Sequence, residues 1–260
     1  MMCNVQCLTH TGLRLALIIG TLVAATFPSY AIAQSLTMAF RNKPPYSYIE
    51  NGEQKGFLLE RTRRLLKQAG IEAVFVDMPP KRIFAEIEAG NQPICSFGWY
   101  KIPERERYAL FSEVLHQDKP HLLLTSEKSA LAIQNHTTLK SLMSDRSLTL
   151  SAADGVSYGP ELDAMIATFP GKTDKALIPP LQVAKKIAAG RADFMFIDQE
   201  DYDYLMASNH EFRGEPLVRT SLKDMPAGLK RYILCSRKVD TETMSRIDAA
   251  IRAESATRSR

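Results

Sequence analysis

Residues 93–113 read PICSFGWYKIPERERYALFSE, and this stretch indicates how the chain folds. Ile94 to Phe97 is a short apolar run, which is typical of a buried strand. Gly98 follows, where the backbone can turn or approach another group closely. Pro103 suits the first position of a helix, and Glu104 complements the positive end of that helix. The stretch therefore predicts a strand, a loop with aromatic and basic side chains, and then a short helix.

The predicted helix carries Arg105 near its start. In open α/β sheets, ligands lie beyond the carboxyl ends of the strands. A guanidinium at such a place can hold a carboxylate through two parallel hydrogen bonds. The alternative is an exposed helix whose acidic and basic side chains only pair with one another in solvent.

The same stretch resembles a segment of the bacterial extracellular solute-binding proteins, family 3, which usually reads G-x-x-x-T-P-E-R-x-x-x-x-x-F-S. Ile102 stands where Thr is usual, and the matching positions are Gly98, Pro103, Glu104, Arg105, Phe111 and Ser112. The resemblance covers nearly all of the chain after residue 33. It implies an α/β fold of the two-lobed type II periplasmic-binding-protein kind, in which each lobe is a mostly parallel sheet flanked by helices. Two crossover strands would join lobe 1 (residues 35–119 and 230–260) to lobe 2 (residues 120–229).

Residues 1–33 have the pattern of a secretory signal peptide. Arg14 supplies the positive charge, Leu15 to Phe27 the apolar core, and Ala31 to Ala33 a small-x-small cleavage site. The apolar run is shorter than the roughly 20 residues that span a bilayer, although a retained anchor is the alternative. We therefore expect export to the periplasm and cleavage of this segment.

Composition narrows the possible partners. The net charge is +4 over 260 residues and no basic block stands out, which argues against a nucleic-acid partner. No histidine or cysteine spacing typical of a metal site occurs among His116, His121, His136 and His210, so we expect neither metal nor cofactor.

The remaining chain alternates predicted strands and helices, a pattern that indicates a largely parallel sheet. The predicted strands include residues 36–40, 72–77, 114–125, 147–152, 217–220 and 232–236, and the predicted helices include residues 57–69, 80–89, 139–144, 161–166, 181–189, 199–207 and 241–254. The strand over 114–125 would carry the chain out of the first lobe, with Pro120 and His121 near the crossover.

Three further segments resemble ligand-side motifs of the family. Residues 41–46 resemble its x-P-P-[FY] loop, residues 155–159 its G-[TS]-[ST]-x loop, and residues 190–198 its G-R-x-D-A-x-x-x-D segment. Asp198 falls where amino-acid binders place the acid that holds the ligand ammonium. It could instead cap the helix that begins at Gln199.

These resemblances imply a ligand site between the lobes. Arg105 would hold a carboxylate, and Ser157 with the amides near Tyr158 would complete an anion site at a helix start, unless they form an ordinary helix cap. Asp198 would take a cationic group. Tyr46, Trp99 and Tyr100 would form apolar walls of the site, and an aromatic face can also hold a cation. The alternative is that these three rings pack in the core or at the rim. The expected ligand-binding residues are Tyr46, Trp99, Tyr100, Lys101, Arg105, Ser157, Tyr158 and Asp198.

The implied function is reversible capture of a small polar solute, amino-acid-like or carboxylate-bearing, by a monomer that delivers it to an ABC importer or a membrane sensor. Periplasmic cyclohexadienyl dehydratases share this fold, and Asp198 or Glu200 could serve as a general acid. No second acid or histidine at motif spacing completes a catalytic set, so we expect no catalytic residues and no enzyme. A purely structural or interaction module is a third possibility.

Cys95 and Cys235 are the two cysteines outside the predicted leader. In an oxidising compartment such a pair tends to close. The resemblance implies that the strand returning from the second lobe lies antiparallel beside the strand of Cys95, which would place the two residues within bonding distance. We predict a disulfide; two buried thiols packed as small apolar groups are the alternative.

Overall fold

The computed structural model describes residues 35–154, 156–176, 180–208 and 217–258. The predicted signal peptide lies outside these residues. None of the helices within the described ranges is long and apolar enough to cross a membrane.

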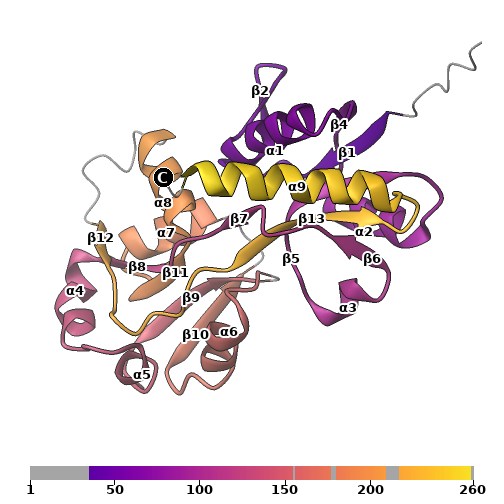
Figure 1. The fold of residues 1–260 in the computed structure, drawn as a ribbon. Helices are drawn as coiled ribbons and strands as arrows, with labels where there is room; N and C mark the ends of the chain where they lie inside the picture. The colour runs from indigo at the N-terminus through magenta and orange to yellow at the C-terminus, as the bar shows by residue number, and fades with distance from the viewer. Residues whose placement is uncertain (1–34, 155, 177–179, 209–216, 259–260) are drawn as a thin grey trace, which may run out of the picture. The chain divides into compact units, whose positions relative to one another are not determined.

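Two large β-sheets organise the fold (Figure 1). The first sheet has the order β4 (Ala73–Asp77), β1 (Leu36–Phe40), β5 (Ile94–Tyr100), β13 (Lys230–Ser236) and β6 (Ala109–Phe111), with β7 (His116–Gln117) also paired to β13. The second sheet has the order β10 (Lys172–Ala176), β9 (Thr149–Ala153), β11 (Phe194–Ile197), β8 (Leu122–Ser126) and β12 (Leu217–Thr220). A separate hairpin, not predicted from the sequence, joins β2 (Tyr48–Glu50) to β3 (Glu53–Lys55).

Each sheet is mostly parallel, as predicted, with one strand that runs against the others. In the first sheet, β4, β1 and β5 are parallel, whereas β13 runs antiparallel to β5, β6 and β7. In the second, β10, β9 and β11 are parallel, whereas β8 runs antiparallel to β11 and β12. The antiparallel strands β13 and β8 are the ones that the chain enters after passing between the sheets.

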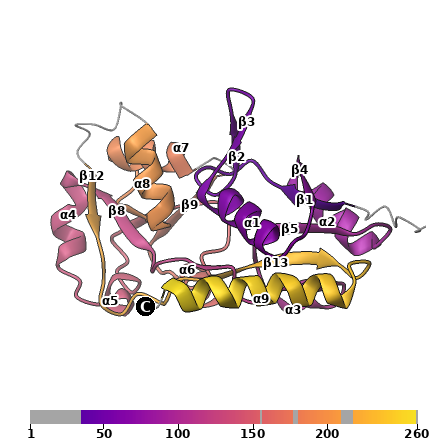
Figure 2. The ribbon, with the colours of Figure 1, turned by 45° about the horizontal axis from the view of Figure 1, so that its top comes forward.

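Helices cover both faces of each sheet. The first sheet packs against α1 (Phe57–Gln68), α2 (Pro80–Ala89), α3 (Pro103–Glu106) and α9 (Thr241–Arg258). The second sheet shares its apolar cores with α4 (Glu127–Gln134), α5 (Leu139–Leu142), α6 (Pro160–Ala167), α7 (Pro180–Ala188) and α8 (Gln199–Ser208). Figures 1 and 2 show α9 alongside α1, where Leu65 and Ile247 share one core; Ile83 of α2 belongs to a separate core. The α/β fold class predicted from the sequence is therefore confirmed.

The two segments that pass between the sheets touch each other. The chain leaves the first sheet after β7 and returns after β12, and the amide of Asp118 donates to the carbonyl of Leu229 at 2.9 Å. A Cβ atom on Gly228 would overlap the carbonyl oxygen of Asp118, so only glycine allows this approach. The prediction of one strand over 114–125 is wrong, since β7 and β8 are separated by residues 118–121, where Pro120 has no N–H to donate. The chain crosses between the sheets at Pro120 and His121, as predicted.

Gly98 forms a bulge within β5 instead of ending the strand. Tyr232 pairs with Trp99 and Ile233 with Phe97, which leaves Gly98 as the extra residue, with a φ of 82°. A bulge shifts the alternation of side chains along the rest of the strand. The strand therefore runs to Tyr100, three residues beyond its predicted end, and the bulge sets the directions of Trp99 and Tyr100.

Cys95 and Cys235 form the predicted disulfide. They lie directly opposite each other on β5 and β13, and their Cα atoms are 4.0 Å apart. The bond thus joins the strand before the passage into the second sheet to the strand after the return from it.

Replacing both cysteines, as Cys95→Ala with Cys235→Ala, is expected to lower the free energy of unfolding by up to about 5 kcal/mol. The reason is that the bond restricts a loop of more than 100 residues in the unfolded chain. Urea unfolding of the variant and the wild type measures the loss, and adding reductant to the wild type should reproduce it. Two alkylatable thiols in the denatured, unreduced wild-type protein would contradict the bond.

Candidate functional site

Six charged side chains from distant parts of the chain meet where β1, the passage between the sheets, α8 and β13 come together. We call them the buried charge cluster: Arg41, Lys43, Asp118, Asp198, Asp201 and Arg231. Charges removed from water are costly unless they are paired and hydrogen-bonded. Their mutual contacts therefore fix the geometry of this region.

Arg231 has the most partners in the cluster, and its side chain is 2 % exposed. Its Nε donates to Asp118 Oδ1 at 2.7 Å, its Nη1 to the carbonyl of Gly98 at 3.2 Å, and its Nη2 to the Tyr100 hydroxyl at 2.9 Å. Nη2 also lies 3.5 Å from Asp198 Oδ2. All three nitrogens of the guanidinium thus lie within hydrogen-bond or ion-pair distance of groups that come from several segments of the chain.

Asp198 follows the last residue of β11 and precedes α8. His121 Nε2 lies 3.1 Å from its Oδ1, and Lys43 Nζ lies 3.7 Å from its Oδ2. The Tyr46 hydroxyl donates to Oδ2 at 3.4 Å. Burial alone would raise the pKa of Asp198, but His121, Lys43 and Arg231 outweigh it and hold the pKa well below its ordinary value. Asp198 is therefore a carboxylate at neutral pH.

Asp201 lies one turn further along α8, and its Oδ2 is 3.4 Å from Lys43 Nζ. Burial raises the pKa of Asp201 to about 6; the Asp198 carboxylate adds to the rise, and Lys43 opposes it. The pKa values of Asp198 and Asp201 thus shift in opposite directions, although both carboxylates pair with the same lysine.

The backbone near α1 holds Lys43 and Tyr46 in place. The amides of Leu58 and Leu59, at the start of α1, both donate to the carbonyl of Tyr46 at 3.1 Å. The amide of Lys43 donates to the carbonyl of Ser47. The loop after β1 is therefore bound to the first turn of a helix, where backbone donors are otherwise unpaired.

A cavity of about 110 Å³ opens beside the cluster. Its polar lining consists of Lys43, His121, Ser157, Tyr158, Asp198 and Asp201, and apolar side chains of α7 and β11 complete it. Because one water fills about 30 Å³ of liquid, the space suits a small solute or a few waters. Among the described residues, no group of three or more His, Cys, Asp or Glu could hold a metal ion.

Ser157 and Tyr158 line this cavity together with Asp198, but the predicted anion-binding donors are already used. Ser157 Oγ donates to Asp163 Oδ2 at 2.6 Å, and the amide of Tyr158 donates to Asp163 Oδ1 at 2.8 Å. The carboxylate of Asp163, in α6, thus occupies the place that the sequence suggested for a ligand anion.

Arg105 does not line the cavity. Its guanidinium lies over the rings of Phe84 at 4.5 Å and Trp99 at 5.5 Å, and its Nη1 donates to the carbonyl of Tyr100 at 2.8 Å. Lys101 is half exposed and pairs with Glu106 at 2.9 Å. The structure therefore shows these two cations in contact with groups of α2, of the first sheet and of α3, and brings neither to Asp198.

Each of the three predicted aromatic walls faces a cation, but the cation belongs to the chain itself. The cation-to-centroid distances are 4.3 Å for Lys43 over Tyr46, 4.3 Å for Arg231 over Tyr46, 4.7 Å for Arg231 over Tyr100, and 4.4 Å for Arg41 over Trp99. Such contacts stabilise a desolvated cation by about 2 kcal/mol or more. These three rings thus stabilise cations of the buried charge cluster.

Of the buried charge cluster only Asp198 was predicted as a site residue; the sequence analysis missed Arg41, Lys43, Asp118, Asp201 and Arg231. Two signals were available: Asp201 stands three residues after Asp198 and so on the same face of the helix, and Arg231 is a charged residue next to an apolar strand.

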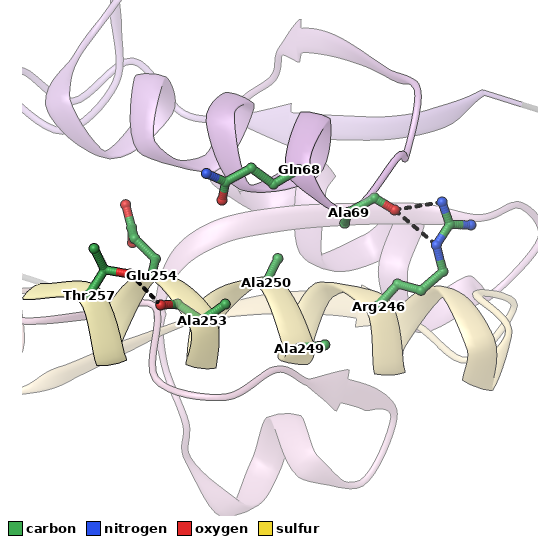
Figure 3. A pocket seen from close by; sticks show the side chains of 8 residues that line it. All are labelled: Gln68, Ala69, Arg246, Ala249, Ala250, Ala253, Glu254 and Thr257. Atoms are coloured by element: carbon green, nitrogen blue, oxygen red, sulfur yellow. Dashed lines mark hydrogen bonds between the residues drawn. The ribbon is translucent and has the colours of Figure 1, made fainter.

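A larger hollow of about 540 Å³ lies between α1 and α9 (Figure 3). Arg246 Nη2 crosses it to donate to the carbonyls of Ala69 and Gly70, both at 2.6 Å, and so satisfies the end of α1. Figure 3 shows alanines of α9, such as Ala253, along its floor. It shares no lining residue with the cavity beside the charge cluster, and we interpret it as an open seam between two helices.

Two α/β sheets linked by paired connecting segments, with a polar cavity next to the linkage, define a two-lobed solute-binding protein. The chain belongs to the bacterial extracellular solute-binding proteins, family 3, whose sequence model matches residues 36–259. Proteins of this family are typically extracellular or periplasmic. Among curated protein sequences, none matches this chain significantly.

Solved structures share the fold. The arginine-, lysine-, histidine-binding protein ArtJ of Geobacillus stearothermophilus is 14 % identical, with a TM-score of 0.62 over 86 % of this chain and 90 % of that one. An ancestral cationic amino acid solute binding protein is 18 % identical, with a TM-score of 0.63 over 86 % and 90 %. A third comes from work on glutathione import via GshT and the cystine ABC importer TcyBC of Streptococcus mutans, at 13 % identity and a TM-score of 0.63 over 86 % and 91 %.

Arg231→Met is expected to lower the free energy of unfolding by about 3–5 kcal/mol, because it leaves the buried Asp118 carboxylate without its partner. The matched control is Arg252→Met, whose pair with Glu113 is about half exposed and contributes under about 1 kcal/mol. Urea unfolding measures both. Equal small losses in the two variants would show that the buried pair does not hold the cluster together.

Asp201→Asn is expected to change how stability depends on pH between about 4 and 6. Its pKa is raised from 3.8 to about 6, so the unfolded chain releases this proton at a lower pH than the folded protein does. The free energy of unfolding contributed by this group therefore falls as the pH rises through that window. Urea unfolding at several pH values should show that asparagine removes this part of the fall; profiles that stay parallel would contradict the shifted pKa.

Proposed function

We propose that this protein captures a small polar solute, amino-acid-like or carboxylate-bearing, in the cavity beside Asp198. Lobe 1 would comprise residues 35–119 and 230–260, and lobe 2 residues 120–229. The observation that carries the proposal is the cavity itself, whose lining combines Lys43 from the first lobe with His121, Tyr158 and Asp198 from the second.

Lining groups from both lobes support capture by closure. A solute bound to one lobe would gain contacts with the other only when the lobes approach, which is how hinge-closing proteins enclose ligands. The paired segments at Asp118 and Leu229 supply a narrow connection about which such a movement could occur.

One solved structure of the same fold is an arginine-, lysine-, histidine-binding protein, which supports a small solute of the amino-acid-like or carboxylate-bearing kind. One of them concerns an ABC importer, and we propose that this protein likewise serves an importer or a membrane sensor as a monomer in the periplasm, after cleavage of the leader. We propose binding rather than catalysis.

One contact favours a second candidate, a dehydratase of the cyclohexadienyl type. His121 lies 3.1 Å from Asp198 in the cavity lining, and such a pair could transfer protons. Release of phenylpyruvate from prephenate, or of phenylalanine from arogenate, by the purified protein would establish this candidate, and the absence of both products would remove it.

The primary test is a thermal-shift screen of the protein without its leader against small metabolites, followed by calorimetry of the hits. A solute present at 100 times its dissociation constant adds about 2.7 kcal/mol of stability. Asp198→Asn removes a charge from the cavity lining and should change the response to the hits, whereas Asp77→Asn, an exposed acid at the end of β4, should leave it unchanged. A screen of broad metabolite classes without any stabilising solute would refute the proposal.

A further inference from the structure

The surroundings of Lys43 are those of a site for an ammonium ion. Its Nζ lies 3.4 Å from Asp201 Oδ2 and 3.7 Å from Asp198 Oδ2, and 4.3 Å from the centre of the Tyr46 ring. Two carboxylates and an aromatic face are the groups that recognise a substituted ammonium. Here the ammonium is supplied by the protein.

Lys43 also forms part of the cavity wall, together with the same two acids. The negative charge of these acids is thus balanced before any solute arrives, by Lys43 on one side and by Arg231 beside Asp198 on the other. A solute ammonium would meet a lysine of like charge at the position where it could best bind.

We propose that Lys43 is a built-in cation that occupies the ammonium position of this cavity, so that the protein prefers solutes that lack an ammonium group to those that carry one. The part concerning Lys43 stands on its contacts alone. The part concerning solutes rests on the proposed binding function.

Chemical rescue tests the position of the lysine. Lys43→Ala removes the three methylenes and the nitrogen that together correspond to propylammonium. Added propylammonium should therefore stabilise this variant in a saturable manner, with a rise in Tm of about 2–4 °C for each kcal/mol of binding energy, whereas 1-propanol, which is neutral and of similar size, should not.

Two control variants separate this effect from a general action of the amine. Lys43→Met fills the space without a charge, and Lys55→Ala removes a lysine that pairs with Glu50 on the β2–β3 hairpin. Neither should respond to propylammonium more than the wild type does. Equal responses of Lys43→Ala, Lys43→Met and wild type would overturn the proposal. If Lys43→Ala does not fold in buffer, refolding is attempted with the amine; recovery with propylammonium supports the proposal, and failure to recover overturns it.

Matched solute pairs test the selectivity of the wild type. Glutarate is compared with glutamate, and 4-methylpentanoate with leucine, because the members of each pair differ by one ammonium group. The acid without the ammonium should give the larger thermal shift, and Lys43→Ala should reverse the order. A larger shift for the amino acids with wild-type protein would overturn the selectivity. If propylammonium rescues Lys43→Ala but no solute shifts any variant, the proposed binding function fails while the assignment of Lys43 stands.

Discussion

The buried guanidinium of Arg231 is the constraint on which the arrangement of the site depends. Because the Arg231 side chain is only 2 % exposed, each nitrogen of its guanidinium needs a hydrogen-bond or ion-pair partner. These partners come from the bulge of β5, from Asp118 in the passage between the sheets, and from Asp198 just before α8. The two sheets have separate apolar cores. Ionic and hydrogen-bonding contacts, rather than a shared core, therefore define the geometry at the cavity.

Much of the fold could be predicted because its signals are local or repeat at short range. The apolar run of β1, the glycine-ended helices and the positions of Cys95 and Cys235 all agree with the structure. The site was harder to predict, since its key pairs are remote: Arg231 and Asp118 are 113 residues apart. A single bulge at Gly98 was enough to change the directions of the aromatic side chains that follow it. An isolated glycine after an apolar run is a signal both for a bulge and for the end of a strand, and here it was interpreted as the end.

The aromatic residues show what kind of information a sequence carries. Tyr46, Trp99 and Tyr100 were expected as faces that could hold a cation, and each faces one. Whether that cation belongs to a ligand or to the chain depends on where long, flexible lysine and arginine side chains end, which follows only from the packed structure. The sequence thus predicts that an aromatic ring contacts a cation, but it does not predict which cation.

The contact between Asp118 and Leu229 has a consequence for how such proteins can be remodelled. Because the residues between them begin and end at one point, that whole segment is attached to the rest of the chain like an inserted module with adjacent ends. The disulfide lies on the other side of the junction and would keep the host sheet joined whatever is inserted. Exchange of residues 119–228 between relatives is therefore a direct route to chimeric receptors with new recognition properties.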